Sequence, residues 1–248
     1  MCCFSQPVES VSHTRIFARS AAQGRQFLVY EMKLAAKSDL AMILPLPVPP
    51  KLAEDAVKFI NLKEYPAFFE DLKTGFPEPV AKGDPRADDH GPAEGKALAV
   101  VEVGDFEASF VPTVADFSRL DERFRLPAAT WDALPGYKSH GFTVFKLKKG
   151  AKTIHPMAFE FPRAEPKKLF FPTVHIHDGK VHATAEFDHS LYCQSREGEA
   201  LQIMTWEESP KLASAFVNAG KTAGIVDAAR HVHRRRISGE QKNEDVLV

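Results

Sequence analysis

Apolar residues recur along the chain in short runs bounded by turn-forming residues, and this pattern predicts strands. Three runs lie near the start of the chain, at 15–21, 25–35 and 40–48. Another lies at 98–112. The remaining runs form a nearly continuous series at 141–150, 153–161, 168–179, 180–193 and 199–208. Sheet is therefore expected to dominate the structure.

Helices are predicted where apolar residues recur every three to four positions. Four are expected, at 49–62, 64–76, 118–126 and 209–236. Pro50 suits a first helical turn, Gly75 suits a helix end, and the basic residues that end the last segment suit a helix C-terminus. Together the elements predict an α+β fold, mostly antiparallel β-sheet with a few flanking helices.

The domain organisation follows from length and composition. With 248 residues the chain is long enough to bury a substantial core, and we expect one α+β domain spanning 1–248. Residues 77–97 are polar and rich in proline and glycine, which predicts a loop or linker. Residues 236–248 are expected to form a flexible tail.

Charge and cysteine content limit the classes of function. A net charge of −1 gives no overall field that would attract nucleic acid or a membrane surface. The longest apolar run, 40–48, is too short to span a bilayer. The N-terminus lacks the pattern of a secretory signal. The chain has only three cysteines, and Cys2 and Cys3 are adjacent, so we expect free thiols and a cytoplasmic location.

Histidines are concentrated between positions 175 and 189, where four of the ten in the chain occur. Asp178 and Gly179 separate two runs of strand-like residues, which predicts a two-residue hairpin turn. Because side chains alternate between the faces of a strand, this register places His175, His177 and His182 on one face. Three imidazoles so placed can meet at a transition metal ion.

The resulting hypothesis is a mononuclear metalloenzyme that acts on a small molecule. Three histidine ligands leave one position open for water or substrate. Zinc is the favoured metal, and copper or iron is possible. A zinc site would catalyse a hydrolysis or lyase reaction, whereas a copper or iron site would catalyse an oxidation–reduction reaction. Glu186 and Asp188 share the predicted face and are candidates to orient a ligand or act as a base.

The sequence leaves open whether several other residues join this site. His189 falls on the opposite face unless a bulge intervenes, and His155 has the parity of inward-facing residues on its own strand. Either Cys2 or Cys3 would supply a soft ligand. The simpler interpretation is a solvated hairpin, which Lys180 supports because an ammonium group is unfavourable beside a metal cation.

Two alternatives belong to other classes of protein. Removal of Met1 would expose the amine and thiol of Cys2, the arrangement of an N-terminal-nucleophile amidohydrolase, with Arg19 holding an oxyanion. The other alternative is a non-enzymatic binding or scaffold protein whose histidines lie on the surface. Nothing in the sequence indicates the oligomeric state.

Overall fold

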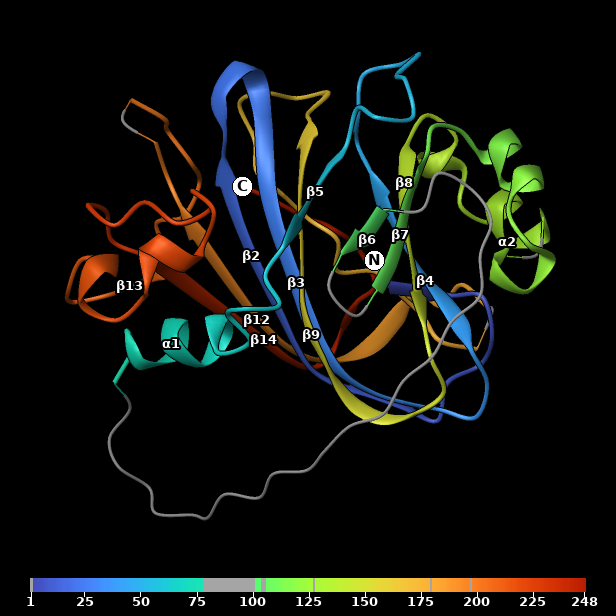
Figure 1. Ribbon diagram of the computed structural model, residues 1–248, viewed down its shortest axis with the longest axis horizontal. Helices are drawn as coiled ribbons and strands as arrows, with labels where there is room; N and C mark the ends of the chain where they lie inside the picture. Colours follow the sequence, from blue (N-terminus) through green and yellow to red (C-terminus); the bar gives the residue numbers. More distant parts are fainter. Residues whose placement is uncertain (1, 78–100, 104–105, 127, 179, 197) are drawn as a thin grey trace.

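Two β-sheets packed face to face form the centre of the structure (Figure 1). The computed structural model describes residues 2–77, 101–103, 106–126, 128–178, 180–196 and 198–248. All but the first residue of the expected loop at 77–97 therefore lie outside the described residues.

The larger sheet has seven strands in the order β13-β14-β12-β2-β3-β9-β5. Their bounds are Glu207–Glu208, His233–Lys242, Thr184–Gln194, Ser10–Ser20, Arg25–Ala36, Gly150–Pro162 and Lys58–Asn61, in that order. The strands predicted at 15–21, 25–35, 153–161 and 180–193 correspond to four of these.

The smaller sheet has six strands in the order β11-β1-β4-β8-β7-β6. Their bounds are His175–Ile176, Cys2–Phe4, Leu40–Leu46, Gly141–Leu147, Phe106–Val111 and Val101–Val103. A third, two-stranded sheet joins β10, Phe170–Phe171, to β15, Val246–Leu247. The prediction of a sheet-rich fold with few helices is confirmed, but the sheets are mixed, because β1 pairs with β11 and β12 with β2 in parallel.

Three apolar clusters explain the layering. The central cluster lies between the sheets and contains Phe145, Phe159 and Leu191. The outer face of the larger sheet packs Phe17 and Tyr192 against α1, Phe68–Thr74, and against buried residues after 212. Short helices between β7 and β8 cover the outer face of the smaller sheet. They are η2, Val114–Arg119, η3, Glu122–Phe124, α2, Ala128–Asp132, and η4, Pro135–Tyr137.

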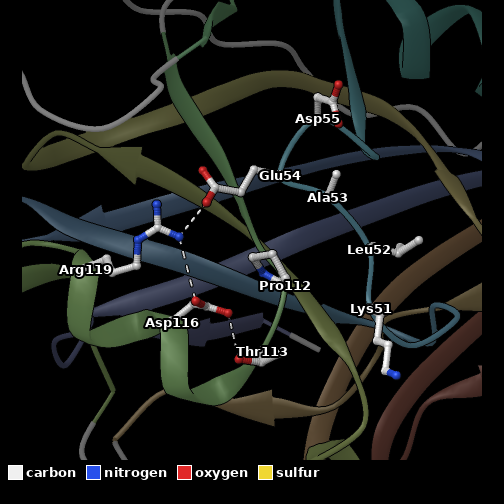
Figure 2. Close-up of a pocket in the computed structure, with 9 residues that line it drawn as sticks. All are labelled: Lys51, Leu52, Ala53, Glu54, Asp55, Pro112, Thr113, Asp116 and Arg119. Carbon is white, nitrogen blue, oxygen red and sulfur yellow. Dashed lines mark hydrogen bonds and ion pairs between the residues drawn. The ribbon is translucent and has the colours of Figure 1, made fainter.

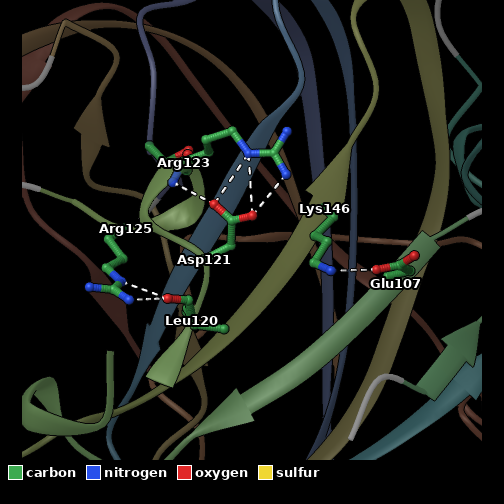
Figure 3. A network of polar contacts seen from close by, with 7 residues as sticks. Glu107, Leu120, Asp121, Arg123, Arg125 and Lys146 are labelled. Atoms are coloured by element: carbon green, nitrogen blue, oxygen red, sulfur yellow. Dashed lines mark hydrogen bonds and ion pairs between the residues drawn. The ribbon is translucent and has the colours of Figure 1, made fainter. Parts of the chain in front are cut away.

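Polar contacts lie within η3 and between two neighbouring strands of the smaller sheet (Figure 3). Asp121 accepts a hydrogen bond from the backbone N–H of Arg123 at 3.0 Å and so caps this short helix. Lys146, on β8, pairs with Glu107 of β7 at 2.5 Å. The Lys146 ammonium also lies 5.2 Å from the centre of the Phe124 ring, which places a cation over the aromatic face.

Two predicted helices are wrong. Within 49–62 the chain forms β5, because Phe59 packs into the core between the sheets while Ile60 packs toward α1. That alternation suits a strand at a sheet edge. Within 209–236 only the 3-10 turns η5, Ala213–Ala215, and η6, Ala219–Lys221, precede β14. The positive φ values of Ala223 and Gly224 are incompatible with a continuous helix.

The expected tail at 236–248 also differs from the structure. Most of it lies in β14 and β15. The last residue is held as well, because the backbone N–H of Leu169 donates to the carbonyl of Val248 at 2.7 Å, and that of Val248 donates back at 3.0 Å. Among the helices in the described part of the chain, none combines the length and the apolar character that a membrane crossing requires.

Candidate functional site

The two segments that carry the clustered histidines do not form the predicted hairpin. His175 and Ile176 form β11, which pairs with β1 in the smaller sheet. The following strand, β12, lies between β2 and β14 in the larger sheet. The chain therefore crosses from one sheet to the other around the predicted Asp-Gly turn, and the predicted register between the two histidine segments is wrong.

Asn243 holds this crossing in place with three hydrogen bonds. Its side-chain oxygen accepts from the backbone N–H of His175 at 2.7 Å. Its side-chain nitrogen donates to the carbonyls of His175 and His182 at 2.9 Å and 3.0 Å. These bonds satisfy backbone groups that hairpin pairing would otherwise have used, so they favour the crossing over the hairpin.

A different set of histidines meets at the junction of the two sheets. The Nε2 atoms of His175 and His189 lie 3.1 Å apart, so one ring donates a hydrogen bond to the other. The ring of His175 also stacks on those of His177 and Phe187, at centroid distances of 4.8 Å and 4.5 Å. His189, which the sequence analysis placed on the opposite face, belongs to this cluster.

Burial keeps both linked histidines neutral. Desolvation, followed by the nearby charge of His177, lowers the pKa of His175 to about 3. Desolvation also lowers the pKa of His189 far below its usual value. The hydrogen bond between His175 and the backbone of Glu186 acts in the opposite direction and raises the pKa of His175.

The remaining predicted residues lie apart from this cluster. His182 is exposed and pairs with Asp178 at 3.0 Å. Glu186 and Asp188 are exposed on the opposite side of β12 from the cluster, and Asp188 accepts a hydrogen bond from the backbone of His13. Their catalytic roles stay predictions.

The N-terminal cysteines and His155 are placed by β1 and β9. The backbone of Cys2 is in register with His175, and the expected role of Cys2 as a nucleophile stays a prediction. Cys3 is buried in the cluster under the short helices. His155 is half-buried on β9, with its Nδ1 atom 3.2 Å from the carbonyl of Pro156.

The metal-binding hypothesis is wrong. Within the described residues, no three or more histidine, cysteine, aspartate or glutamate side chains are arranged so that they could hold a metal ion. The physical reason is the crossing, which separates His182 from His175 and leaves His175 bonded to another histidine. The preference for zinc over copper or iron remains untested and has no site among these residues.

A groove that the sequence analysis did not anticipate lies between the edges of the two sheets. We call it the β5–β7 groove and define it by Val57, Lys58 and Phe59 on one side, and Ser109, Phe110 and Val111 on the other. Its volume is about 390 Å³. Pro112, Leu120 and the charged side chains of Glu54, Asp55, Asp116 and Arg119 complete the lining.

The floor of the groove is apolar and continuous with the core. Val57 and Phe110 are buried, and Phe59 is partly buried. The ring of Phe59 makes edge contacts with Phe145 at 5.8 Å. This contact packs the floor of the groove directly onto the core between the sheets.

An ion-paired bridge lines both the groove and a neighbouring hollow (Figure 2). Arg119 extends from η2 across to Glu54, which precedes β5, and also lies 3.7 Å from Asp116. Asp116 in turn accepts a hydrogen bond from the hydroxyl of Thr113 at 2.7 Å. Beyond the bridge an open hollow of about 600 Å³ continues along Lys51, Leu52 and Ala53.

Comparisons with known proteins complete the description of the site. No family model matches the chain, and no curated protein matches it. Among solved structures, baculovirus P35 is similar, with 13% identity, 96% of each chain covered and a TM-score of 0.46. A mutated baculovirus P35 after caspase cleavage has 15% identity, coverage of 95% of this chain and 99% of that one, and a TM-score of 0.46.

A third solved structure is the caspase-8/P35 complex, with 11% identity, 95% of each chain covered and a TM-score of 0.44. The partner of P35 in that structure is a protein. The finding contradicts our expectation of a small-molecule partner.

Proposed function

We propose that this protein works by binding an extended segment of another protein in the β5–β7 groove. The observation that carries the proposal is the position of the groove between two sheet edges. Val57–Phe59 includes the start of β5, which ends the larger sheet, and Ser109–Val111 lies beyond Ala108, the last residue of β7 that pairs with the described part of β6. In the described part of the chain, no strand pairs with these two edges on the groove side.

Edge strands offer main-chain donors and acceptors to a new strand. A peptide that adds to such an edge gains affinity from backbone hydrogen bonds, which any sequence can make. Its side chains alternate, so every second one would face the apolar floor formed by Val57, Phe59 and Phe110. We therefore expect ligands with apolar residues at every second position.

Charges around the rim have both signs, with Lys58 and Arg119 near Asp55 and Asp116. Arg119 is already engaged by acidic neighbours. A strongly charged ligand would therefore gain little from the rim, and the apolar and main-chain contacts would supply most of the affinity.

The test fills the groove by substitution. Ser109→Tyr places a ring in the groove, whereas Ser118→Tyr places the same ring on an exposed site of η2 outside the lining. Both variants and the wild type would be screened against a phage-displayed library of random peptides. A panel of cysteine proteases would be added, including caspase-8, because that protein is the partner of P35 in one of the similar structures.

We expect the wild type and Ser118→Tyr to enrich the same peptides or bind the same protease, and Ser109→Tyr to lose that binding. Thermal melting would establish that Ser109→Tyr remains folded. Equal binding by the two tyrosine variants would place any ligand elsewhere and refute the proposal. So would failure of the wild type to enrich any peptide or bind any protease of the panel.

A further inference from the structure

The strand walls of the β5–β7 groove are short. Val57–Phe59 and Ser109–Val111 line its two sides, and each stretch corresponds to about 10 Å of extended chain at roughly 3.3 Å per residue. Toward Ala108, the described part of β6 pairs with β7 and stands in line with the groove. A bound segment longer than these walls therefore has to continue in the other direction, past Val57 and Val111.

The open hollow lies in that other direction. Lys51–Asp55, which precedes Val57 in the chain, lines it together with Pro112 and Thr113, which follow Val111. The residues that line both the hollow and the groove are Glu54, Asp55, Pro112, Asp116 and Arg119. The two cavities therefore share a boundary, and a segment that leaves the groove at this end enters the hollow.

The ion pair between Arg119 and Glu54 lies at this shared boundary (Figure 2). Glu54 belongs to the segment before β5, whereas Arg119 belongs to η2, which follows β7. The pair thus connects the two sides of the boundary. Both side chains are half exposed, at 49% and 46%. Asp116 lies 3.7 Å from the same Arg119 nitrogen and is a second partner for it within η2.

We propose that the Arg119–Glu54 pair is a strap across the exit of the β5–β7 groove, which a bound segment has to open in order to continue into the hollow. The inference rests on the proposed function, because it concerns how the same groove admits its ligand. Opening the strap costs little, since exposed ion pairs stabilise proteins weakly and are weakened further by salt. When Glu54 is released, the guanidinium of Arg119 keeps Asp116 beside it.

The strap makes binding depend on the length of the ligand. A segment of about three residues fits between the strand walls and leaves the strap closed. A longer segment opens the strap, so part of its binding free energy is used to separate Arg119 from Glu54. Removing the ion pair should therefore strengthen the binding of long segments and leave that of short ones unchanged.

Neutralising either partner tests the strap. Arg119→Gln and Glu54→Gln each remove the ion pair and keep a polar side chain. Arg123→Gln is the matched control, because Arg123 forms an exposed ion pair with Asp121 at 2.8 Å and lies outside both linings. The ligand is a peptide that the wild type selects from the phage library, used at full length and in versions shortened from each end. Isothermal titration calorimetry at low and at high salt would measure the dissociation constants.

We expect Arg119→Gln and Glu54→Gln each to bind the full-length peptide more tightly than the wild type at low salt, by roughly two- to fivefold. Arg123→Gln should bind it like the wild type. High salt should bring the wild type toward the two strap variants, because it screens the ion pair. The gain should disappear for the peptide shortened from the end that enters the hollow.

Failure of the strap and failure of the proposed function are distinguishable. If the wild type binds a peptide that Ser109→Tyr excludes, but neither glutamine variant at the strap binds it more tightly, the strap is wrong and the proposed function stands. The same conclusion follows if Arg123→Gln strengthens binding as much as Arg119→Gln, or if the gain persists for both shortened peptides. If the wild type binds no peptide or protease at all, the proposed function falls and the strap with it.

Discussion

The Nε2 atoms of His175 and His189 lie 3.1 Å apart, although His175 belongs to the smaller sheet and His189 to the larger one. Their contact joins the two sheets at the place where the chain crosses between them. Because both rings are buried and neutral, the joint depends on pH in a way that an apolar contact would not.

Acidification should weaken the fold through these histidines. Their folded pKa values lie below the unfolded value of 6.5, so the unfolded chain binds more protons as the pH falls below about 6.5. Their contribution to the free energy of unfolding is complete above that pH and declines as the pH falls, at roughly 1.4 kcal/mol per pH unit for each ring. For His175 the decline ends at about pH 3. Urea denaturation at several pH values between 7.5 and 5 would measure the slope.

Substituting His189 tests whether this histidine cluster causes the pH dependence of the free energy of unfolding. His189→Phe should flatten it by about the share of one histidine, because a phenyl ring does not titrate. Parallel curves for wild type and His189→Phe would show that the cluster does not control the pH dependence.

Glu31 should act on stability in the opposite direction. Burial raises the pKa of this carboxyl to about 7, against the lowering effect of Arg15. The folded state therefore holds the proton between about pH 4.5 and 7, and the wild type loses stability as the pH rises through that window. Glu31→Gln removes this loss, so its stability relative to wild type should improve from pH 5 to pH 8, on the order of 2 kcal/mol.

Glu70 provides the matched comparison, because it pairs with the same Arg15 but is largely exposed. Its pKa is lowered, mainly by the hydrogen bond to Arg15. Glu70→Gln should therefore become less stable relative to wild type as the pH rises, and by a smaller amount. The same pH trend in both variants would contradict the assignment for Glu31.

A methyl group at Gly141 should disturb the floor of the β5–β7 groove. A Cβ there would lie 2.6 Å from two ring atoms of Phe110 and 3.0 Å from Val48. Gly141→Ala is expected to cost about 1–3 kcal/mol in the free energy of unfolding, because the ring must move. Calorimetric or urea unfolding would measure this.

Two further variants test whether the clash with Phe110 causes the loss of stability in Gly141→Ala. Phe110→Leu in the Gly141→Ala background should recover part of the stability, since the smaller side chain relieves the clash. Gly136→Ala, where an added Cβ meets nothing within 4 Å, should change stability by less than about 0.5 kcal/mol. A Gly141→Ala protein as stable as wild type would mean that Phe110 adapts freely.

Asp245 should be among the most sensitive polar positions. One carboxylate oxygen accepts from the backbone N–H groups of Thr173 and Val174 at 2.8 Å and 3.0 Å, and the other from the hydroxyl of Tyr137 at 2.6 Å. Asp245→Ala leaves three donors without this acceptor, and each costs roughly 1–3 kcal/mol where water cannot replace it. Tyr137→Phe, which removes one bond, should cost about 1 kcal/mol.

A double-mutant cycle would test whether these effects share a cause. If the Tyr137 hydroxyl acts through Asp245, Tyr137→Phe should cost much less in the Asp245→Ala background than in the wild type. Additive losses, measured by urea unfolding, would show that the two residues stabilise the protein independently.

The secondary structure followed from the sequence best where apolar residues were dense and the turns were clear. The strands at 25–35 and 40–48 became β3 and β4 with nearly the predicted bounds, because both segments lie in sheet interiors and most of their side chains are buried. The segment at 49–62 was misassigned because its apolar spacing is compatible with a helix and with an edge strand. The neighbouring β9 decided between them.

By itself, the sequence determined that the chain forms strands and which side chains along each strand share a face. Only the tertiary structure decided which strands became neighbours. The periodicity of a strand is satisfied by any partner that covers its apolar side, so the choice between a local hairpin and a distant strand depends on long-range contacts. Asn243, 61 positions beyond His182, bonds to the backbones of both His175 and His182, and in the resulting arrangement His189, not His182, lies beside His175.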